Sequence, residues 1–304
     1  PLLAEVYERR NETIRARRIR TVSALLGYSP PEKRPLRSGG YRSTLSEELR
    51  QRLLLPPLLR GSLTVDLLQA MVPGLLRLFP PTWPWPNEPV PATKVPDAGF
   101  QSAVSEVLRL FAIDAEVLVA HQVPGGAQAV ELPTGRKVAL IDQSALAMGD
   151  SERRFVLGRT LDALRGGYAT VLRLSPSELL QTSRLLTMML LPTAEQPPES
   201  REFLQLLPRR SQQVFERAAQ SRPTQTVAEV VASFTLCADR AGLLACDDIA
   251  TAVQMLVKLT GDDAASHGLS DVAGTIGMVL GHAPNGAELL HYYLSDTFHE
   301  LTQT

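Results

Sequence analysis

The 304-residue sequence contains little cysteine and no long apolar run. Its two cysteines, Cys237 and Cys246, cannot build a disulfide framework, and their spacing matches no zinc or redox motif. We therefore expect buried free thiols in a protein of a reducing compartment such as the cytoplasm. No apolar stretch approaches the roughly 20 residues that a membrane span needs, so no span is predicted.

Aromatic residues are also scarce, at 5% of the chain, so leucine, valine and alanine must supply most of the core. The apolar fraction of 44% and charged fraction of 21% are typical of a globular protein. The length allows one large domain or two small ones.

The common catalytic signatures are absent from the sequence. There is no Gly-x-Ser-x-Gly elbow, no phosphate-binding glycine loop and no Gly-x-Gly-x-x-Gly. A helical zinc site needs two histidines four residues apart on one face. None of the five histidines forms such a pair, namely His121, His267, His282, His291 and His299. We therefore predict neither a metal nor a cofactor.

Hydrophobic periodicity predicts an α+β fold that is predominantly helical, with a small sheet of about three strands. The predicted strands are 116–120, 127–132 and 137–141, separated by Pro-Gly and Pro-Thr-Gly turns. Helices are predicted at 2–26, around 45–53 and 65–79, and through most of the chain after residue 150. One of them should begin with a capping box formed by Ser175 and Glu178.

A proline-dense stretch suggests a boundary within the chain. Residues 80–96 contain seven prolines, which favours an extended connector. We predict a basic helical region at 1–80, a linker at 81–97 and a main domain at 98–304. Trp83 and Trp85 in this linker are candidate partner-binding residues; the alternative is that they pin the linker to its own domain. Because the chain begins with proline, we expect it to be part of a longer protein.

Positive charge is concentrated near the start of the chain. Residues 1–60 carry thirteen Arg or Lys against six Asp or Glu, while the whole chain has a net charge of −1. Arg10, Arg17 and Arg18 are candidate partner-binding residues on a solvated helix face or a protein contact. A nucleic-acid interface is the alternative, but no aromatic residues interleave the arginines for base stacking.

Two segments are the most informative about ancestry. The first is Phe155-Val-Leu-Gly158 with the residues that follow, on a predicted helix after the last strand. The second is Ala238-Asp-Arg-Ala-Gly-Leu-Leu-Ala245. Together they resemble zinc peptidases of the CAAX-prenyl-endopeptidase and heat-shock-protease type. The resemblance covers roughly residues 100–260 and implies a zincin-like fold for the main domain. The end of the chain is similar to domains that follow helical repeats in some bacterial proteins.

The resemblance also implies that the catalytic residues have been replaced. The first zinc histidine falls on Arg159, the catalytic glutamate on Thr160 and the second histidine on Ala163. The third ligand falls on Thr235. Only an aspartate that orients a ligand in the family is retained, as Asp239. We expect Asp239 to pair with Arg159, so that an ion pair cross-links two helices in place of the metal.

Three hypotheses about function follow. The first is a non-catalytic pseudopeptidase, serving as a protein-interaction or scaffold module and joined to a protein partner or an upstream repeat domain. The second is an enzyme of different chemistry, for which Asp162, Asp239, Cys237 and Glu152 are the candidates near the old cleft. The third is a nucleic-acid-binding module that uses the arginine-rich N-terminal helix.

Overall fold

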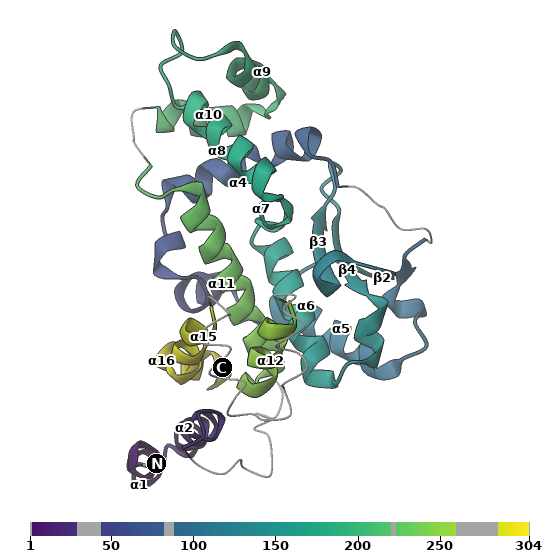
Figure 1. Ribbon diagram of the computed structural model, residues 1–304, viewed down its shortest axis with the longest axis vertical. Coiled ribbons are helices and arrows are strands. Elements are labelled where there is room, and N and C mark those ends of the chain that lie inside the picture. The colour runs from purple at the N-terminus through teal and green to yellow at the C-terminus, as the bar shows by residue number, and fades with distance from the viewer. Residues whose placement is uncertain (1, 29–43, 82–87, 220–222, 260–284, 304) are drawn as a thin grey trace.

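The computed structural model describes residues 2–28, 44–81, 88–219, 223–259 and 285–303. The described chain is mainly helical and contains one small sheet, as predicted (Figure 1). The longer helices are α1 (Leu2–Arg9), α2 (Thr13–Leu25), α4 (Leu63–Leu78), α5 (Ala98–Phe111), α6 (Asp150–Arg165), α8 (Pro176–Met189), α9 (Pro198–Leu206), α10 (Arg209–Ala218), α11 (Val227–Cys246), α12 (Ile249–Leu259), α15 (Gly286–Leu294) and α16 (Asp296–Gln303). Short helical segments include α3 (Glu47–Leu49), a π-helical turn at Arg50–Leu54 and α7 (Ala169–Arg173).

The sheet contains four strands in the order β1-β2-β4-β3. Strands β2 (Glu116–Ala120), β3 (Ala127–Glu131) and β4 (Lys137–Asp142) match the three predicted segments closely. Strand β2 runs parallel to β4, with Val119 opposite Ile141, while β3 pairs with β4 antiparallel. The sequence did not predict β1 (Val90–Pro91), which pairs antiparallel with β2. Its proline is tolerated because β1 lies at the sheet edge.

Strand β1 belongs to the stretch predicted as a linker, and the residues after it are also packed. Ala92 and Val95 are buried in the main apolar core. The tryptophans of that stretch, Trp83 and Trp85, lie outside the described residues. The division of the chain at 81–97 stays a prediction, but the described end of the stretch takes part in the fold.

Helix α6 is the central element, lying between α11 and the sheet (Figure 1). It packs against α5, α11, α12, β3 and β4. Glycines allow α6 and α11 to approach closely, because a Cβ built at Gly158 would lie 2.7 Å from the Ala241 carbonyl oxygen. A Cβ at Gly242 would lie 2.8 Å from Cγ of Arg159. The close approach brings polar side chains on the two helices within hydrogen-bond reach.

Helix α4 joins the N-terminal part of the chain to the same core. Its buried residues Leu67, Leu68 and Met71 belong to one apolar cluster with residues of α6, α11 and α15. Helix α4 also packs against α7, α8, α9 and α10. Its Ser62 cap accepts a hydrogen bond from Val65 N, and Pro73 lies within the helix.

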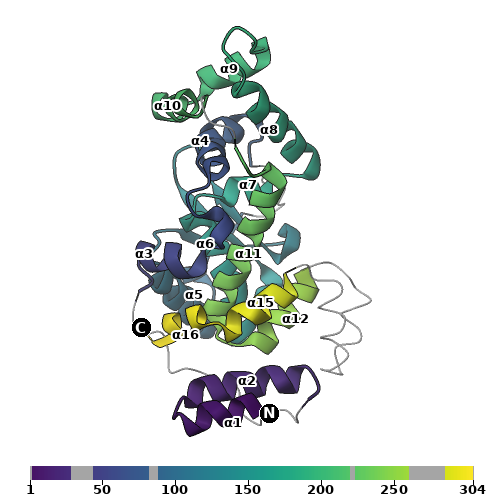
Figure 2. The same cartoon turned by 90° about the vertical axis from the view of Figure 1, so that its left-hand side faces the viewer.

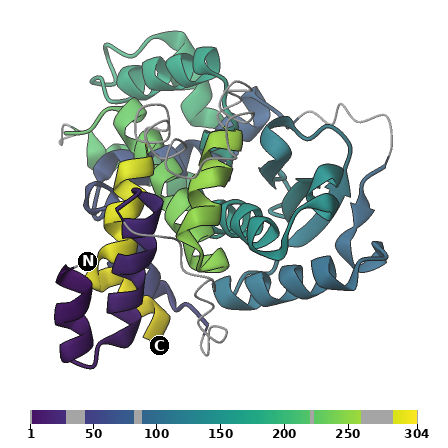
Figure 3. The same ribbon diagram turned by 60° about the horizontal axis from the view of Figure 1, so that its bottom comes forward.

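The predicted single helix at 2–26 is wrong, because the chain forms two helices that pack side by side (Figure 2). The break lies at Asn11, whose φ of 61° is left-handed. Asparagine tolerates this conformation better than most residues. The end of α1 is closed by a hydrogen bond from Glu12 N to the Tyr7 carbonyl. Helix α2 packs against α15, and the view in Figure 3 shows the pair beside the C-terminal helices.

Candidate functional site

The four positions onto which the resemblance maps the zinc ligands and catalytic glutamate of the peptidases line one hollow. Arg159, Thr160 and Ala163 reach it from α6, and Thr235 reaches it from α11. The hollow has a volume of about 380 Å³, within the usual range for ligand sites. Its other lining residues come from β3, α7, α11 and the turn before β3, and are Pro124, Ala127, Gln128, Ala129, Ala169, Leu172, Arg173 and Ala238.

The predicted ion pair between Arg159 and Asp239 is confirmed. Arg159 Nε donates to Asp239 Oδ1 at 2.7 Å, linking α6 to α11. The second carboxylate oxygen accepts from Asn285 Nδ2 at 2.8 Å. The Asp239 side chain is 1% exposed, whereas that of Arg159 is 25% exposed. Burial raises the pKa of Asp239, and the Arg159 and Asn285 contacts oppose that rise without cancelling it.

The two threonines of the hollow use their hydroxyls within their own helices. Thr160 Oγ1 donates to the Val156 carbonyl at 2.8 Å, and Thr235 Oγ1 donates to the Val231 carbonyl at 3.1 Å. Ala163 has no donor atom. Over the described ranges, no group of three or more His, Cys, Asp or Glu residues is arranged to hold a metal.

Asp162 and Cys237, two candidates for a different chemistry, belong to a buried network outside the hollow. Asp162 is fully buried and accepts from Arg50 Nε at 2.7 Å. It also accepts from the Tyr168 hydroxyl and, at 3.4 Å, from Cys237 Sγ. Burial raises the pKa of both Tyr168 and Cys237, and the charge of Asp162 adds to the effect. The cysteine is therefore a poor nucleophile at neutral pH.

The remaining candidate, Glu152, lies at the N-terminus of α6. Its carboxylate accepts from Gly149 N at 2.8 Å and pairs with Lys258 at 2.5 Å. The residue therefore caps α6, and it does not line the hollow. Sequence reasoning missed Arg50 and Tyr168 as partners of Asp162, since no motif connects them.

The arginines near the start of the chain do not share one exposed face. Arg10 is exposed, but Arg18 is 4% exposed and lies over the rings of Phe298 and Tyr293 at 4.6 and 5.4 Å. Arg18 also donates to Thr302 Oγ1 at 2.6 Å. This burial removes Arg18 from the candidate partner-binding residues, because it binds the chain's own C-terminal helices.

Neighbouring arginines on α2 are also engaged. Arg15 pairs with Asp296 at 2.8 Å, and Arg20 pairs with Glu8 at 2.5 Å. Arg17 is half-buried and has an interaction of its own. Much of the basic charge that the sequence concentrates here is thus neutralised or covered.

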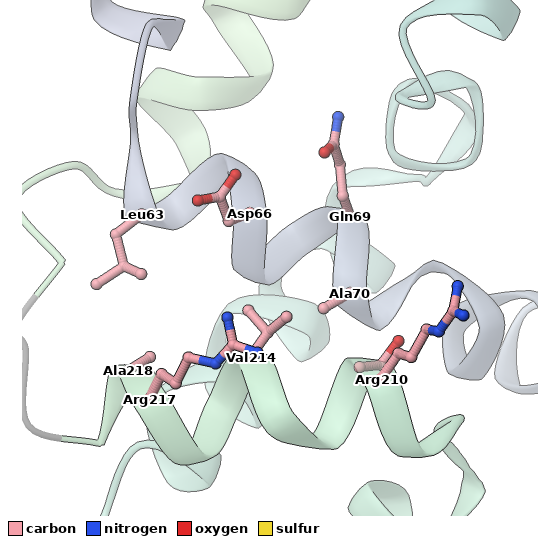
Figure 4. Close-up of a pocket in the computed structure, with 9 residues that line it drawn as sticks. Leu63, Asp66, Gln69, Ala70, Arg210, Val214, Arg217 and Ala218 are labelled. Atoms are coloured by element: carbon pink, nitrogen blue, oxygen red, sulfur yellow. The ribbon is translucent and has the colours of Figure 1, made fainter.

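A second hollow, of about 520 Å³, lies between α4 and α10 (Figure 4). Leu63 and Val214 point into the space between the helices, and Arg217 extends from α10 toward α4. Asp66 on α4 adds a charge of opposite sign. None of the predicted site residues that the structure describes lines this hollow.

Comparisons with protein-family models, with curated proteins and with solved structures found no match. None of the helices in the described part of the chain is both long and apolar enough to cross a membrane.

Proposed function

We propose that this chain is a non-catalytic, peptidase-like binding module that holds a segment of a protein partner in the hollow between α6, α7, α11 and β3. The observation that carries the proposal is the convergence of Arg159, Thr160, Ala163 and Thr235 on that hollow. Arg159, Thr160 and Ala163 share one stretch of α6, and Thr235 reaches the same hollow from α11, a helix much later in the sequence.

The side chains in the hollow support binding better than hydrolysis. A hydrolytic zinc site needs ligands for the metal and a base for the attacking water. In their place stand an arginine paired with a buried aspartate, two threonines bonded to their own helices, and an alanine. The arginine, threonine and alanine side chains do not accept a proton readily at neutral pH, and Asp239 is not among the lining residues, so the described lining offers no base for a nucleophile.

In this proposal the Arg159–Asp239 ion pair replaces the zinc ion as the link between the two helices. It joins α6 and α11 where a zinc ion would have held ligands from both helices. The proposed location is the cytoplasm, since Cys237 and Cys246 are unpaired and buried. The nucleic-acid alternative is weakened by the burial of Arg18 and by the ion pairs of Arg15 and Arg20.

The first experiment restores the family's pattern in a single variant. It carries Arg159→His, Thr160→Glu, Ala163→His and Thr235→Glu, and its metal content is compared with that of the unaltered chain by elemental analysis. We expect zinc at about one ion per chain in the variant only, and no cleavage of unfolded casein by the unaltered chain. A folded variant without zinc would contradict the zincin-like arrangement. Stoichiometric zinc or proteolysis in the unaltered chain would contradict the loss of catalysis.

The second experiment tests binding directly. A random peptide library displayed on phage is selected against the full chain and against Ala129→Trp, which fills the hollow from half-buried β3. We expect peptides that bind the unaltered chain and lose binding to Ala129→Trp. The matched control is Ala287→Trp, an exposed position on α15. Selected peptides that bind all three proteins equally would place the binding site elsewhere.

A further inference from the structure

The hollow that we propose as the binding site is positively charged. Arg159 from α6 and Arg173 from α7 are the charged side chains among its described lining residues, and no carboxylate lines it. The rest of the lining is alanine, threonine, proline, leucine and glutamine. Asp239, behind Arg159, offsets one of the two positive charges. Glu178 lies near enough to Arg173 to act on its charge but does not line the hollow, so the lining itself presents a net positive charge to a ligand.

Both arginines keep donors that the described protein does not use. Arg159 is bonded through Nε, and its two terminal nitrogens have no partner within the described ranges. Arg173 donates from Nη2 to the Phe79 carbonyl at 2.5 Å and forms no ion pair with the described residues. Burial lowers the pKa of Arg173, with Glu178 opposing the shift, yet a guanidinium stays protonated at neutral pH. A carboxylate accepts two parallel hydrogen bonds from such a group.

The same hollow contains one edge of the sheet. Ala127, Gln128 and Ala129 of β3 line it. Strand β3 pairs with β4 on one side, and its residues form no other backbone hydrogen bond with the described chain. Helix α7 packs against β3, and the unpaired edge of the strand offers N–H and C=O groups to an extended peptide. The short alanine side chains leave space for the peptide to approach.

We infer that the hollow recognises an extended protein segment that carries a carboxylate, which Arg159 and Arg173 receive while the segment lies along β3. This inference rests on the proposed function and adds the chemistry of the ligand to it. The carboxylate belongs either to an acidic side chain or to the C-terminus of the partner. The chemistry at the arginines is the same in both cases.

The test uses three acetylated peptides that share one apolar sequence. The first ends in a free carboxylate, the second is amidated with a central glutamate, and the third is amidated with a central glutamine. Each is titrated into the isotope-labelled full chain, and the amide signals of β3 and α7 locate the binding. We expect at least one carboxylate peptide to bind about tenfold or more tightly than the glutamine peptide, as hydrogen bonds to charged groups predict. The peptide with the greater gain identifies the source of the carboxylate.

Variants then test whether the preference for carboxylate peptides arises at the hollow. Arg173→Gln should reduce the preference to near unity, and Arg173→Lys should retain part of it because the charge remains. The matched control is Arg210→Gln, an exposed arginine beside the second hollow, which should leave the preference unchanged. Arg159 is not altered in this series because it also holds Asp239.

The outcomes distinguish a failure of carboxylate recognition from a failure of the proposed binding function. Equal affinity for all three peptides, with signals still changing at β3, would overturn carboxylate recognition and leave the proposed binding function in place. If Arg210→Gln and Arg173→Gln lose the preference for carboxylate peptides equally, carboxylate recognition in this hollow is also overturned. No binding of any peptide would overturn both proposals.

Discussion

Removing the charge of Arg159 should destabilise the fold in a pH-dependent way. Arg159→Met keeps most of the aliphatic stem that packs near Gly242 but leaves the buried Asp239 carboxylate with Asn285 as its one hydrogen-bond partner among the described residues. Breaking a fully buried ion pair costs about 3–5 kcal/mol. Because the Arg159 side chain is 25% exposed, we expect a smaller loss of about 2–3 kcal/mol at neutral pH.

The pH dependence follows from the carboxyl group. Burial already raises the pKa of Asp239, and Arg159 opposes the rise, so the variant's pKa should be higher still. A raised pKa means that the folded state holds its proton to higher pH than the unfolded chain does. Its contribution to stability is full below the unfolded pKa, about 3.9, and is lost as pH rises through the folded value. The variant's deficit should therefore grow from about pH 4 to pH 7.

Urea unfolding, monitored by circular dichroism at several pH values, measures this loss of stability. The control is Arg52→Met, since Arg52 and Glu300 lie 3.4 Å apart with side chains 58% and 55% exposed. Its effect should stay within about 0.5 kcal/mol. Adding Asp239→Asn to Arg159→Met should flatten the pH dependence. A deficit below about 0.5 kcal/mol, or one that is constant with pH, would show that the pair does not cross-link the helices.

Three further predictions concern the packing around this pair. Gly158→Ala should lower the free energy of unfolding by about 1–3 kcal/mol, because its Cβ would collide with the Ala241 carbonyl. The control Gly149→Ala, whose Cβ would make ordinary contacts, should change the stability little. Equal urea midpoints for the two variants would contradict the close approach of α6 and α11. Asp162→Asn should cost about 2–3 kcal/mol in the same assay, because it leaves buried Arg50 with the more exposed Glu47, at 3.4 Å, as its remaining carboxylate partner among the described residues; a neutral effect would contradict a stabilising role for the Arg50–Asp162 pair. Cys237 and Cys246 should resist a thiol reagent such as DTNB until urea unfolds the chain, because burial raises the pKa of both thiols; rapid labelling of the folded protein would contradict their burial.

The regular elements could be predicted because their signals are local. The three longer strands follow from short apolar segments bounded by glycine turns, and the Ser175–Glu178 capping box is confirmed at the start of α8. Strand β1 was missed because it has only two residues, one of them proline. The break at Asn11 was missed because a single left-handed residue leaves no trace in the apolar pattern.

The site was predictable only in part. The resemblance selected positions on α6 and α11, and the Arg159–Asp239 pair followed from their chemistry. Arg173 belongs to no recognisable motif. It lines the hollow because the turn after α6 brings α7 to that position, so the sequence did not indicate it. The partnership of Arg50 with Asp162 spans 112 residues. Contacts of that range depend on tertiary packing, which neither spacing nor composition encodes.

The buried contact between Arg18 and Thr302 has a consequence for how the chain acquires its structure. The two residues are separated by 284 positions, and the rings that cover Arg18 belong to Tyr293 and Phe298. During synthesis, α1 and α2 emerge before α15 and α16, so their docking surface does not exist until those later helices have been made. Contacts this distant in sequence form late and slow the folding of a chain. Helices α1 and α2 should therefore be among the last described elements to gain protection from hydrogen exchange, although they precede the other described elements in the sequence.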